Sequence, residues 1–205
     1  MSSDWKDDWK GLIQGDQEAF RRLYQKSVDE LFRYALKITR DEGLIEDGIQ
    51  DLYIKLWNRR ARLPEDAHPK AYLYTSLRNN LIRVMERHYN KFSDLEMDQM
   101  NFGEAASAES DWIDAERNDI RSTSLKNALG ALPERQKELI YLKYQAGLSY
   151  EEIEEVMGIT NQSLRNLMNR AIKKLRAHLG DELFLIFFFL GTKAFLMDLF
   201  RDNVI

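Results

Sequence analysis

A helix-length segment near the C-terminal end of the chain carries side chains of the kinds that bind nucleic acid. Every ionised side chain between residues 161 and 179 is basic, and amides are interleaved with them. Guanidinium and amide groups donate hydrogen bonds to base edges, and cations neutralise phosphates. We predict that double-stranded DNA is contacted by Gln162, Arg165, Asn166, Asn169, Arg170, Lys173 and Arg176. The alternative is a solvated basic helix on an ordinary bundle.

A second basic segment, residues 70–91, has tyrosines among its cations and two asparagines at its centre. Bases of a single strand stack on aromatic rings, while neighbouring cations neutralise the phosphates. The candidate residues are Tyr72, Tyr74, Arg78, Asn79, Asn80, Arg83 and Arg87. Basic helices with a few tyrosines are common, so this pattern alone also fits an ordinary surface helix.

The elements expected to position the first group form a helix-turn-helix. Pro133 suits a first helical position, and Gly147 suits a left-handed cap at the end of that helix. Ser149 and Glu152 have the spacing of a capping box, and Gly158 closes the short helix that follows. The basic helix has an apolar stripe on its other side, formed by Leu164, Met168, Ala171, Ile172 and Leu175. A short capped helix directly before a basic helix favours DNA reading.

The second group is expected to belong to an N-terminal helical domain. Asp16 is the predicted N-cap of its first long helix, and a third long helix is predicted to open at Pro69. The stripe assigned to the core of the first helix is Phe20, Leu23, Tyr24, Val28, Leu31, Phe32, Ala35 and Ile38. A helix between these two buries Ile45, Ile49, Leu52, Tyr53 and Leu56, and its other face and edges carry Asp47, Gln50, Asp51 and Lys55. On physical grounds alone, that polar face is a solvated surface.

Composition limits the classes of function. The chain has 205 residues, 44% of them hydrophobic, which is enough for two small domains, and regular strand-like alternation is hard to find. The predicted fold is all-α, with two helical domains joined by an acidic linker. The absence of cysteine excludes disulfides, cysteine zinc sites and thiol nucleophiles. The three histidines are isolated, and no phosphate-cradling or nucleophile motif occurs. We therefore expect no enzyme, no cofactor and no metal site.

The charge of the chain is segregated. The net charge is −4, yet residues 93–120 contain nine acids and only one base, Arg117. This stretch predicts a flexible acidic linker. A further reading is that the linker follows a positively charged path on a partner, or shields the basic helix when no DNA is bound. The N-terminus has early acids and no apolar segment, so we expect no signal peptide and a cytoplasmic protein.

The tail is unusually apolar. Residues 183–190 form an unbroken run of large apolar side chains, and five more follow between residues 195 and 200. A membrane span needs about 20 apolar residues, and Gly191, Lys193 and Asp198 interrupt this segment. We expect no stable span. The tail should be covered by the C-terminal domain, by another copy of the chain, or by a partner that binds it as a helix in a groove.

Four blocks of sequence resemble an extracytoplasmic function (ECF) type bacterial RNA polymerase sigma factor. They are GDQEAFRRLY, EDGIQDLYIKLW, HPKAYLYTSLRNNLI and the series from LPERQKELIYLKY to RAIKKLR. The resemblance covers nearly the whole chain through Leu179. It implies sigma region 2 at residues 9–91, an acidic linker at 92–124, region 4 at 125–180 and a tail at 181–205. It also implies a protein that binds core RNA polymerase and directs it to minus-10 and minus-35 promoter elements.

The resemblance assigns roles to the residues above. Asp47, Gln50 and Asp51, with Lys55, match the segment that binds the largest polymerase subunit. The block around Tyr72 to Arg87 matches the segment that melts and holds the minus-10 element, and the last helix matches the minus-35 reader. The family often has Asp at the position of Arg83 and a basic residue at that of Glu86. These departures leave the pocket for the flipped nucleobase only partly assigned, and we place Tyr72, Asn79 and Asn80 there.

The resemblance also suggests a role for the linker. The linker would thread near the polymerase active centre. The resemblance does not extend to the tail, for which an anti-sigma or recruiting protein is an alternative to self-packing, based on its apolar residues alone. The runner-up function is a helix-turn-helix transcriptional regulator without sigma activity. It would need an N-terminal sensor, for which residues 9–91 carry no ligand signature.

Overall fold

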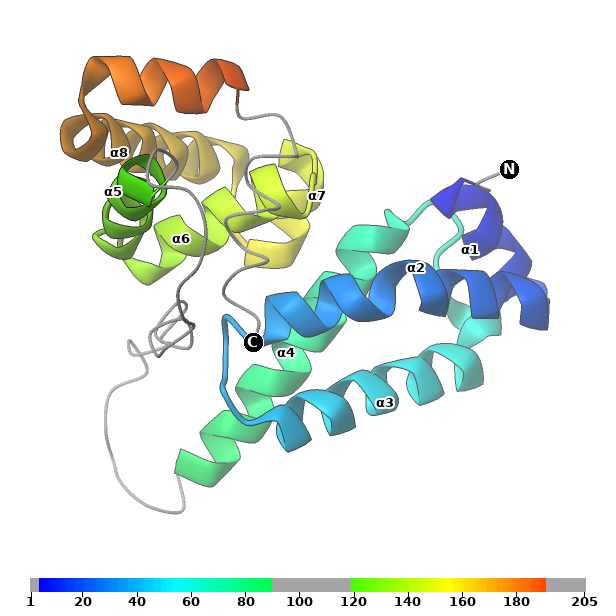
Figure 1. Ribbon diagram of the computed structural model, residues 1–205. Helices are drawn as coiled ribbons and strands as arrows, with labels where there is room; N and C mark the ends of the chain where they lie inside the picture. Colours follow the sequence, from blue (N-terminus) through cyan, green and yellow to red (C-terminus); the bar gives the residue numbers. More distant parts are fainter. Residues whose placement is uncertain (1–3, 90–118, 191–205) are drawn as a thin grey trace. The chain divides into compact units, whose positions relative to one another are not determined.

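The computed structural model describes residues 4–89 and 119–190, and within these ranges the chain is helical, without strands. This confirms the all-α prediction. The contacts divide the chain into two compact units, the first with α1 to α4 and the second with α5, α6, α8 and the start of α7 (Figure 1). Most of the predicted acidic linker and residues 191–205 of the tail lie outside the described residues. The last residues assigned to the linker, 119–124, are helical and open α5.

The first unit begins with a helical hairpin of α1 (Trp5–Ile13) and α2 (Gln17–Ala35). Asp16 caps α2 as predicted, because its Oδ1 accepts from the backbone N–H of Glu18 at 2.8 Å. Gly15 has φ 88°, a left-handed conformation that lets the chain reverse between the helices. A Cβ on Gly11 would lie 2.7 Å from the Cβ of Ala19, so the hairpin closes tightly at this point.

Two further helices complete this unit, α3 (Glu42–Asn58) and α4 (Pro69–Tyr89), with the short 3-10 helix η1 (Arg60–Arg62) between them. Both α2 and α3 pack against α4. The core that they share contains Leu23, Leu31, Ile45, Leu52, Leu56, Leu73, Leu77 and Leu81. The predicted opening of α4 at Pro69 is confirmed.

The apolar stripe of α2 is only partly buried, which corrects its assignment to the core. Leu23, Leu31 and Ala35 are fully buried, whereas the ring of Tyr24 is 43% exposed. Phe20, Val28 and Phe32 are half-buried. The stripe is wider than the contact of α2 with the core, so its outer side chains face a groove instead.

A buried ion cluster fixes α1 to α2. Asp8 is fully buried, and its carboxylate pairs with Arg22 at 2.6 Å and with Lys26 at 2.5 Å. Arg22 donates a hydrogen bond to the Asp8 carboxylate, and this bond raises the pKa of the Arg22 guanidinium. A buried carboxylate needs such partners because its desolvation is otherwise uncompensated.

The second unit contains α5 (Asp119–Gly130), α6 (Glu134–Ile140), the π-helical turn η3 (Tyr141–Gln145), the start of α7 (whose full range is Tyr150–Met157) and α8 (Asn161–Leu190). Its core includes Leu125, Leu132, Leu139, Ile140, Leu142, Leu148, Ile153, Leu164, Ala171 and Leu175. Gly180 has φ 71° and interrupts α8, so the start of the apolar tail is a separate helical stretch. Among the described residues, no helix is long and apolar enough to cross a membrane.

Replacing Asp8 with alanine is expected to lower the free energy of unfolding of the first unit. The substitution leaves two cations without their shared carboxylate and should cost about 1 to 3 kcal/mol. Urea unfolding followed by tryptophan fluorescence measures it, because Trp5, Trp9 and Trp57 all lie in this unit. The control is Asp7→Ala, an exposed acid on the same helix that should change stability by less than about 0.5 kcal/mol. Equal effects of the two substitutions would contradict a special role for Asp8.

Candidate nucleic-acid interface

The predicted helix-turn-helix is present in the second unit. The capping box is confirmed, since the N–H of Ser149 donates to Glu152 Oε2 at 2.7 Å and the N–H of Glu152 donates to Ser149 Oγ at 3.2 Å. Gly147 and Gly158 both have left-handed backbones, with φ 69° and φ 63°. Gly147 follows the helix that precedes the box, and Gly158 follows α7, the helix that the box opens, directly before the turn into α8.

One detail of the first helix differs from the prediction. Pro133 is the N-cap of α6 rather than its first residue, and its carbonyl accepts from Gln136 at 2.8 Å and Lys137 at 3.0 Å. The helix then widens into the π turn η3, where the N–H of Ala146 donates to the carbonyl of Tyr141 at 3.0 Å.

Helix α8 presents its polar side chains as predicted. All seven candidate residues are exposed: Gln162, Arg165, Asn166, Asn169, Arg170, Lys173 and Arg176. On the opposite face Leu164, Ala171 and Leu175 are fully buried. The side chain of Gln162 donates to Asn166 at 3.3 Å, so the two amides lie side by side one helical turn apart. The arrangement offers donors to base edges from a helix whose other side is fixed by the core.

A basic hollow lies between α3 and α4 in the first unit, with a volume of about 240 Å³. We call it the α3–α4 hollow. It is lined by Leu52, Lys55, Leu56, Arg59, Tyr72, Ser76, Asn79, Asn80 and Arg83. An aromatic ring, two amides and three cations therefore surround one cavity, with leucines as its apolar wall. These groups can stack on a base, hydrogen-bond its edge and neutralise the adjoining phosphates.

The hollow gathers only part of the predicted single-strand set. Tyr72, Asn79, Asn80 and Arg83 line it, whereas Arg78 and Arg87 are not among its lining residues. Tyr74 is 1% exposed and its ring packs 4.9 Å from that of Tyr34. A ring buried in this way is a core side chain and cannot stack on a base without repacking the unit, so we do not retain it as a DNA contact.

Three polar lining residues, in addition to the two leucines, were not predicted as part of this set. Lys55 was grouped with the polar face of α3, and Arg59 and Ser76 were not singled out. The signal for Arg59 was available, because three arginines occur within four residues after the end of α3, at positions 59, 60 and 62. Lys55 also pairs with Asp51 at 2.9 Å, with both side chains more than half exposed. It therefore connects the hollow with the acidic part of α3.

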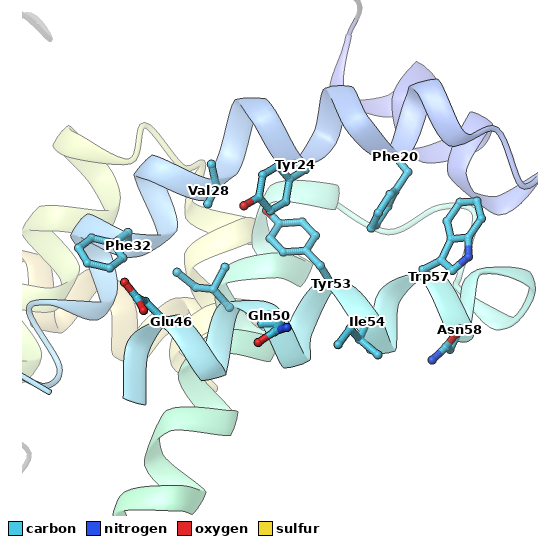
Figure 2. A pocket seen from close by; sticks show the side chains of 11 residues that line it. Phe20, Tyr24, Val28, Phe32, Glu46, Gln50, Tyr53, Ile54, Trp57 and Asn58 are labelled. Atoms are coloured by element: carbon cyan, nitrogen blue, oxygen red, sulfur yellow. The ribbon is translucent and has the colours of Figure 1, made fainter. Parts of the chain in front are cut away.

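An apolar groove of about 780 Å³ lies between α2 and α3 (Figure 2). We call it the α2–α3 groove. Phe20, Tyr24, Val28 and Phe32 line it from α2, and Glu46, Ile49, Gln50, Tyr53, Ile54, Trp57 and Asn58 line it from α3. The side chain of Ile54 is 50% exposed. Of the predicted polymerase-binding residues, Gln50 lines the groove, while Asp47 and Asp51 are exposed elsewhere on α3.

Aromatic contacts order the wall of this groove. The Phe20 ring lies 5.1 Å from Trp57, and the rings of Tyr24 and Tyr53 are 4.8 Å apart. Arg60 covers the Trp57 ring at 4.3 Å. The hydroxyl of Tyr53 lies 2.5 Å from Ser27 Oγ, and burial raises the pKa of Tyr53 to about 12. Tyr53 therefore stays neutral at physiological pH.

Comparison with known proteins gives matches in both units. Residues 23–90 match the family described as sigma-70 region 2, and residues 122–175 match sigma-70, region 4. The chain is 25% identical over 172 residues to the ECF RNA polymerase sigma factor SigL of Mycobacterium tuberculosis strain H37Rv, covering 83% of this chain and 94% of the relative. It is 22% identical over 174 residues to the ECF sigma factor SigK of Mycobacterium sp. strain KMS, covering 82% and 87%.

A solved structure shares the fold. The structure of CnrH in complex with the cytosolic domain of CnrY matches with a TM-score of 0.56 and 20% sequence identity, covering 86% of this chain and 97% of the other. At this identity the likeness speaks for the fold alone.

The turn before α8 gives a prediction with a matched control. Gly158→Ala should destabilise the second unit by about 1 kcal/mol, because an L side chain is strained at positive φ. Gly130→Ala is the control, since a Cβ there also meets nothing within 4 Å but Gly130 has no left-handed backbone. Urea unfolding followed by far-UV circular dichroism compares them. A loss of stability in both variants, or in neither, would show that backbone strain at the turn is not the cause.

Proposed function

Because this chain belongs to the ECF group of the sigma-70 family and directs RNA polymerase to promoters, we propose how its two units divide that task. The second unit, within residues 125–180, reads the minus-35 element with α8. The first unit, within residues 9–91, binds core polymerase with α3 and holds the melted minus-10 strand in the α3–α4 hollow. Residues 92–124 link the two.

The observation that carries this proposal is the pairing of two nucleic-acid surfaces with different chemistry on one chain. Helix α8 offers exposed amides and cations in a row, which suits the major groove of duplex DNA. The α3–α4 hollow combines the Tyr72 ring with amides and cations around a cavity, which suits an unstacked base. A regulator without sigma activity has no use for the second surface. That alternative is not favoured, because sigma-70 region 2 matches residues 23–90.

For the contact with core polymerase we propose the outer surface of α3 together with the α2–α3 groove. Interfaces of this kind combine an apolar centre with a polar rim. The exposed Ile54 and Tyr24 supply apolar anchors, and Gln50, Asp47 and Asp51 supply polar and acidic groups close by in the sequence of α3. The aromatic contacts in the groove wall support this role, because an ordered surface loses less entropy on binding.

We also propose a regulatory partner, which acts with the chain in the cytoplasm. CnrH has been solved with the cytosolic domain of another protein, CnrY. The apolar tail, residues 181–205, is the segment of this chain that we propose to receive an anti-sigma or recruiting protein. Its first part continues as helix through Leu190, and a helix rich in large apolar residues requires a covering surface.

Run-off transcription with purified core polymerase and a randomised promoter library tests the proposed division of the task. We expect transcripts whose templates share one sequence near position −35 and another near −10. Transcripts that share only an upstream sequence would contradict the proposed role of the hollow. Transcripts that share only a minus-10 sequence would contradict the role of α8.

Asp51→Arg is expected to weaken binding to core polymerase. Reversing a charge at an interface removes its pairing and adds repulsion, at a cost of about 2 to 5 kcal/mol. The fold should persist, because the ion pair of Asp51 with Lys55 lies on the surface, and such surface pairs contribute about 1 kcal/mol at most. A pull-down with tagged core polymerase measures the loss. Asp7→Arg, the same change at an exposed acid on α1, should bind normally, and normal binding by Asp51→Arg would remove this face from the interface.

Two substitutions on α8 separate base reading from phosphate binding. Arg165→Ala should lower affinity for the selected minus-35 duplex by about 1 to 3 kcal/mol while changing scrambled duplexes less. Lys173→Ala should weaken all duplexes evenly and lower the salt slope by about 1. Fluorescence anisotropy over a salt series provides both quantities. If the two variants behave alike, Arg165 contacts only phosphate.

A further inference from the structure

We propose that Trp9 is a positioning residue of the minus-10 site, and that α1 is therefore part of that site. Helix α1 lies before the segment that matches sigma-70 region 2, which begins at residue 23. The inference rests on the proposed function of the α3–α4 hollow. Trp9 does not line the hollow itself, but it contacts two elements that determine its shape.

The first contact is with the ring that lines the hollow. Trp9 is 1% exposed, and its ring centroid lies 5.1 Å from that of Tyr72, with the two planes inclined by 59°. This tilted geometry is favourable for aromatic pairs. One side of the Tyr72 ring is thus held by a buried side chain that comes from another helix.

The second contact is with the segment between α3 and α4. The indole Nε1–H of Trp9 donates to the backbone carbonyl of Pro64 at 2.9 Å. This segment joins Arg59 at the end of α3 to Tyr72 in the first turn of α4, and both of these residues line the hollow. Beyond η1 the segment has no regular secondary structure as far as Pro69. The indole therefore fixes a carbonyl in the stretch that sets the spacing between the two lining residues.

Helix α1 is itself anchored on both sides, which makes it a suitable support. The buried Asp8 ties it to α2 through Arg22 and Lys26. Trp5 lies one turn before Trp9 on the same helix face, and the ammonium of Lys70, in the first turn of α4, lies 5.6 Å from its ring. Lys70 also pairs with Glu30 of α2 at 2.7 Å. The start of α4 is consequently held against α1 and α2 together.

A stacking ring that is already held in place loses less conformational freedom when a base arrives. Supporting groups of this kind affect how well a site discriminates between ligands as well as how tightly it binds. Loss of the indole hydrogen bond should therefore reduce the preference of the hollow for its proper strand. A purely structural role for Trp9 would lower stability and leave that preference unchanged.

The test compares Trp9→Phe, Leu12→Val and Tyr72→Ala in the full chain bound to core polymerase. Trp9→Phe keeps an aromatic ring and removes the hydrogen bond to Pro64, while Leu12→Val alters another fully buried side chain of α1. The probes are a fluorescent single strand that carries the minus-10 sequence selected in the run-off library and a scrambled strand. A minus-35 duplex is the control for the second unit.

For Trp9→Phe we expect the ratio of selected to scrambled affinity to fall about three- to tenfold, with duplex binding unchanged and the protein folded by circular dichroism. Leu12→Val should leave the ratio unchanged. If Trp9→Phe behaves like Leu12→Val while Tyr72→Ala weakens strand binding, the positioning role is overturned and the proposed hollow stands. If Tyr72→Ala has no effect on strand binding, the proposed function of the hollow itself fails.

Discussion

The close approach of α3 and α4 at Gly48 is the constraint on which the first unit depends. A Cβ at this position would lie 3.1 Å from Leu81 Cδ2 and 3.5 Å from Leu77 Cδ1, so a larger residue would push the helices apart. Because the helices are close there, Lys55 and Arg59, further along α3, line one hollow with Asn79, Asn80 and Arg83 of α4. The cations are thereby held around one cavity whose lining residues include no acid, an arrangement that favours an anionic ligand.

Helix α3 has three uses because its side chains point in three directions. Its buried stripe joins the core through Ile45, Leu52 and Leu56. One flank contributes to the α3–α4 hollow, and the other contributes Ile54 and Trp57 to the α2–α3 groove. Exposing apolar side chains in the groove sacrifices stabilisation of about 25 cal/mol per Å² that burial would supply. In the polymerase contact that we propose, the partner covers this surface and the stabilisation is gained on binding.

Sequence patterns predicted local structure well wherever a short-range contact determines it. The Asp16 cap, the capping box at Ser149 and the left-handed glycines each depend on residues within a few positions, and each is present. Periodicity identified the apolar face of α2, but it could not say that the ring of Tyr24 stays 43% exposed. That depends on packing between distant segments.

The α3–α4 hollow shows the same limit of prediction from sequence, because distant segments form it. Tyr72 and Tyr74 are two residues apart, about 200° around a helix, so they could not share a face: Tyr72 lines the hollow and Tyr74 enters the core. The helical period places Tyr72 and Tyr74 on different faces. The prediction instead grouped them because both are tyrosines in a basic segment. Arg59 and Lys55 come from another helix, and only the tertiary contact of α3 with α4 brings them to the same place. The positioning of Tyr72 by Trp9 spans 63 positions of sequence, and no local pattern predicts it.

The segregation of charge explains how an acidic chain can bind DNA. With a net charge of −4, the molecule as a whole does not attract phosphates. Its cations are instead concentrated locally, on the exposed face of α8 in one unit and around the hollow in the other, the two surfaces that we propose bind DNA. Each surface alone is small, so its affinity for DNA is modest. When core polymerase holds both units on one promoter, the second contact becomes intramolecular and the two free energies combine. Specific promoter binding then depends on the polymerase, which is the behaviour that a transcription initiation factor requires.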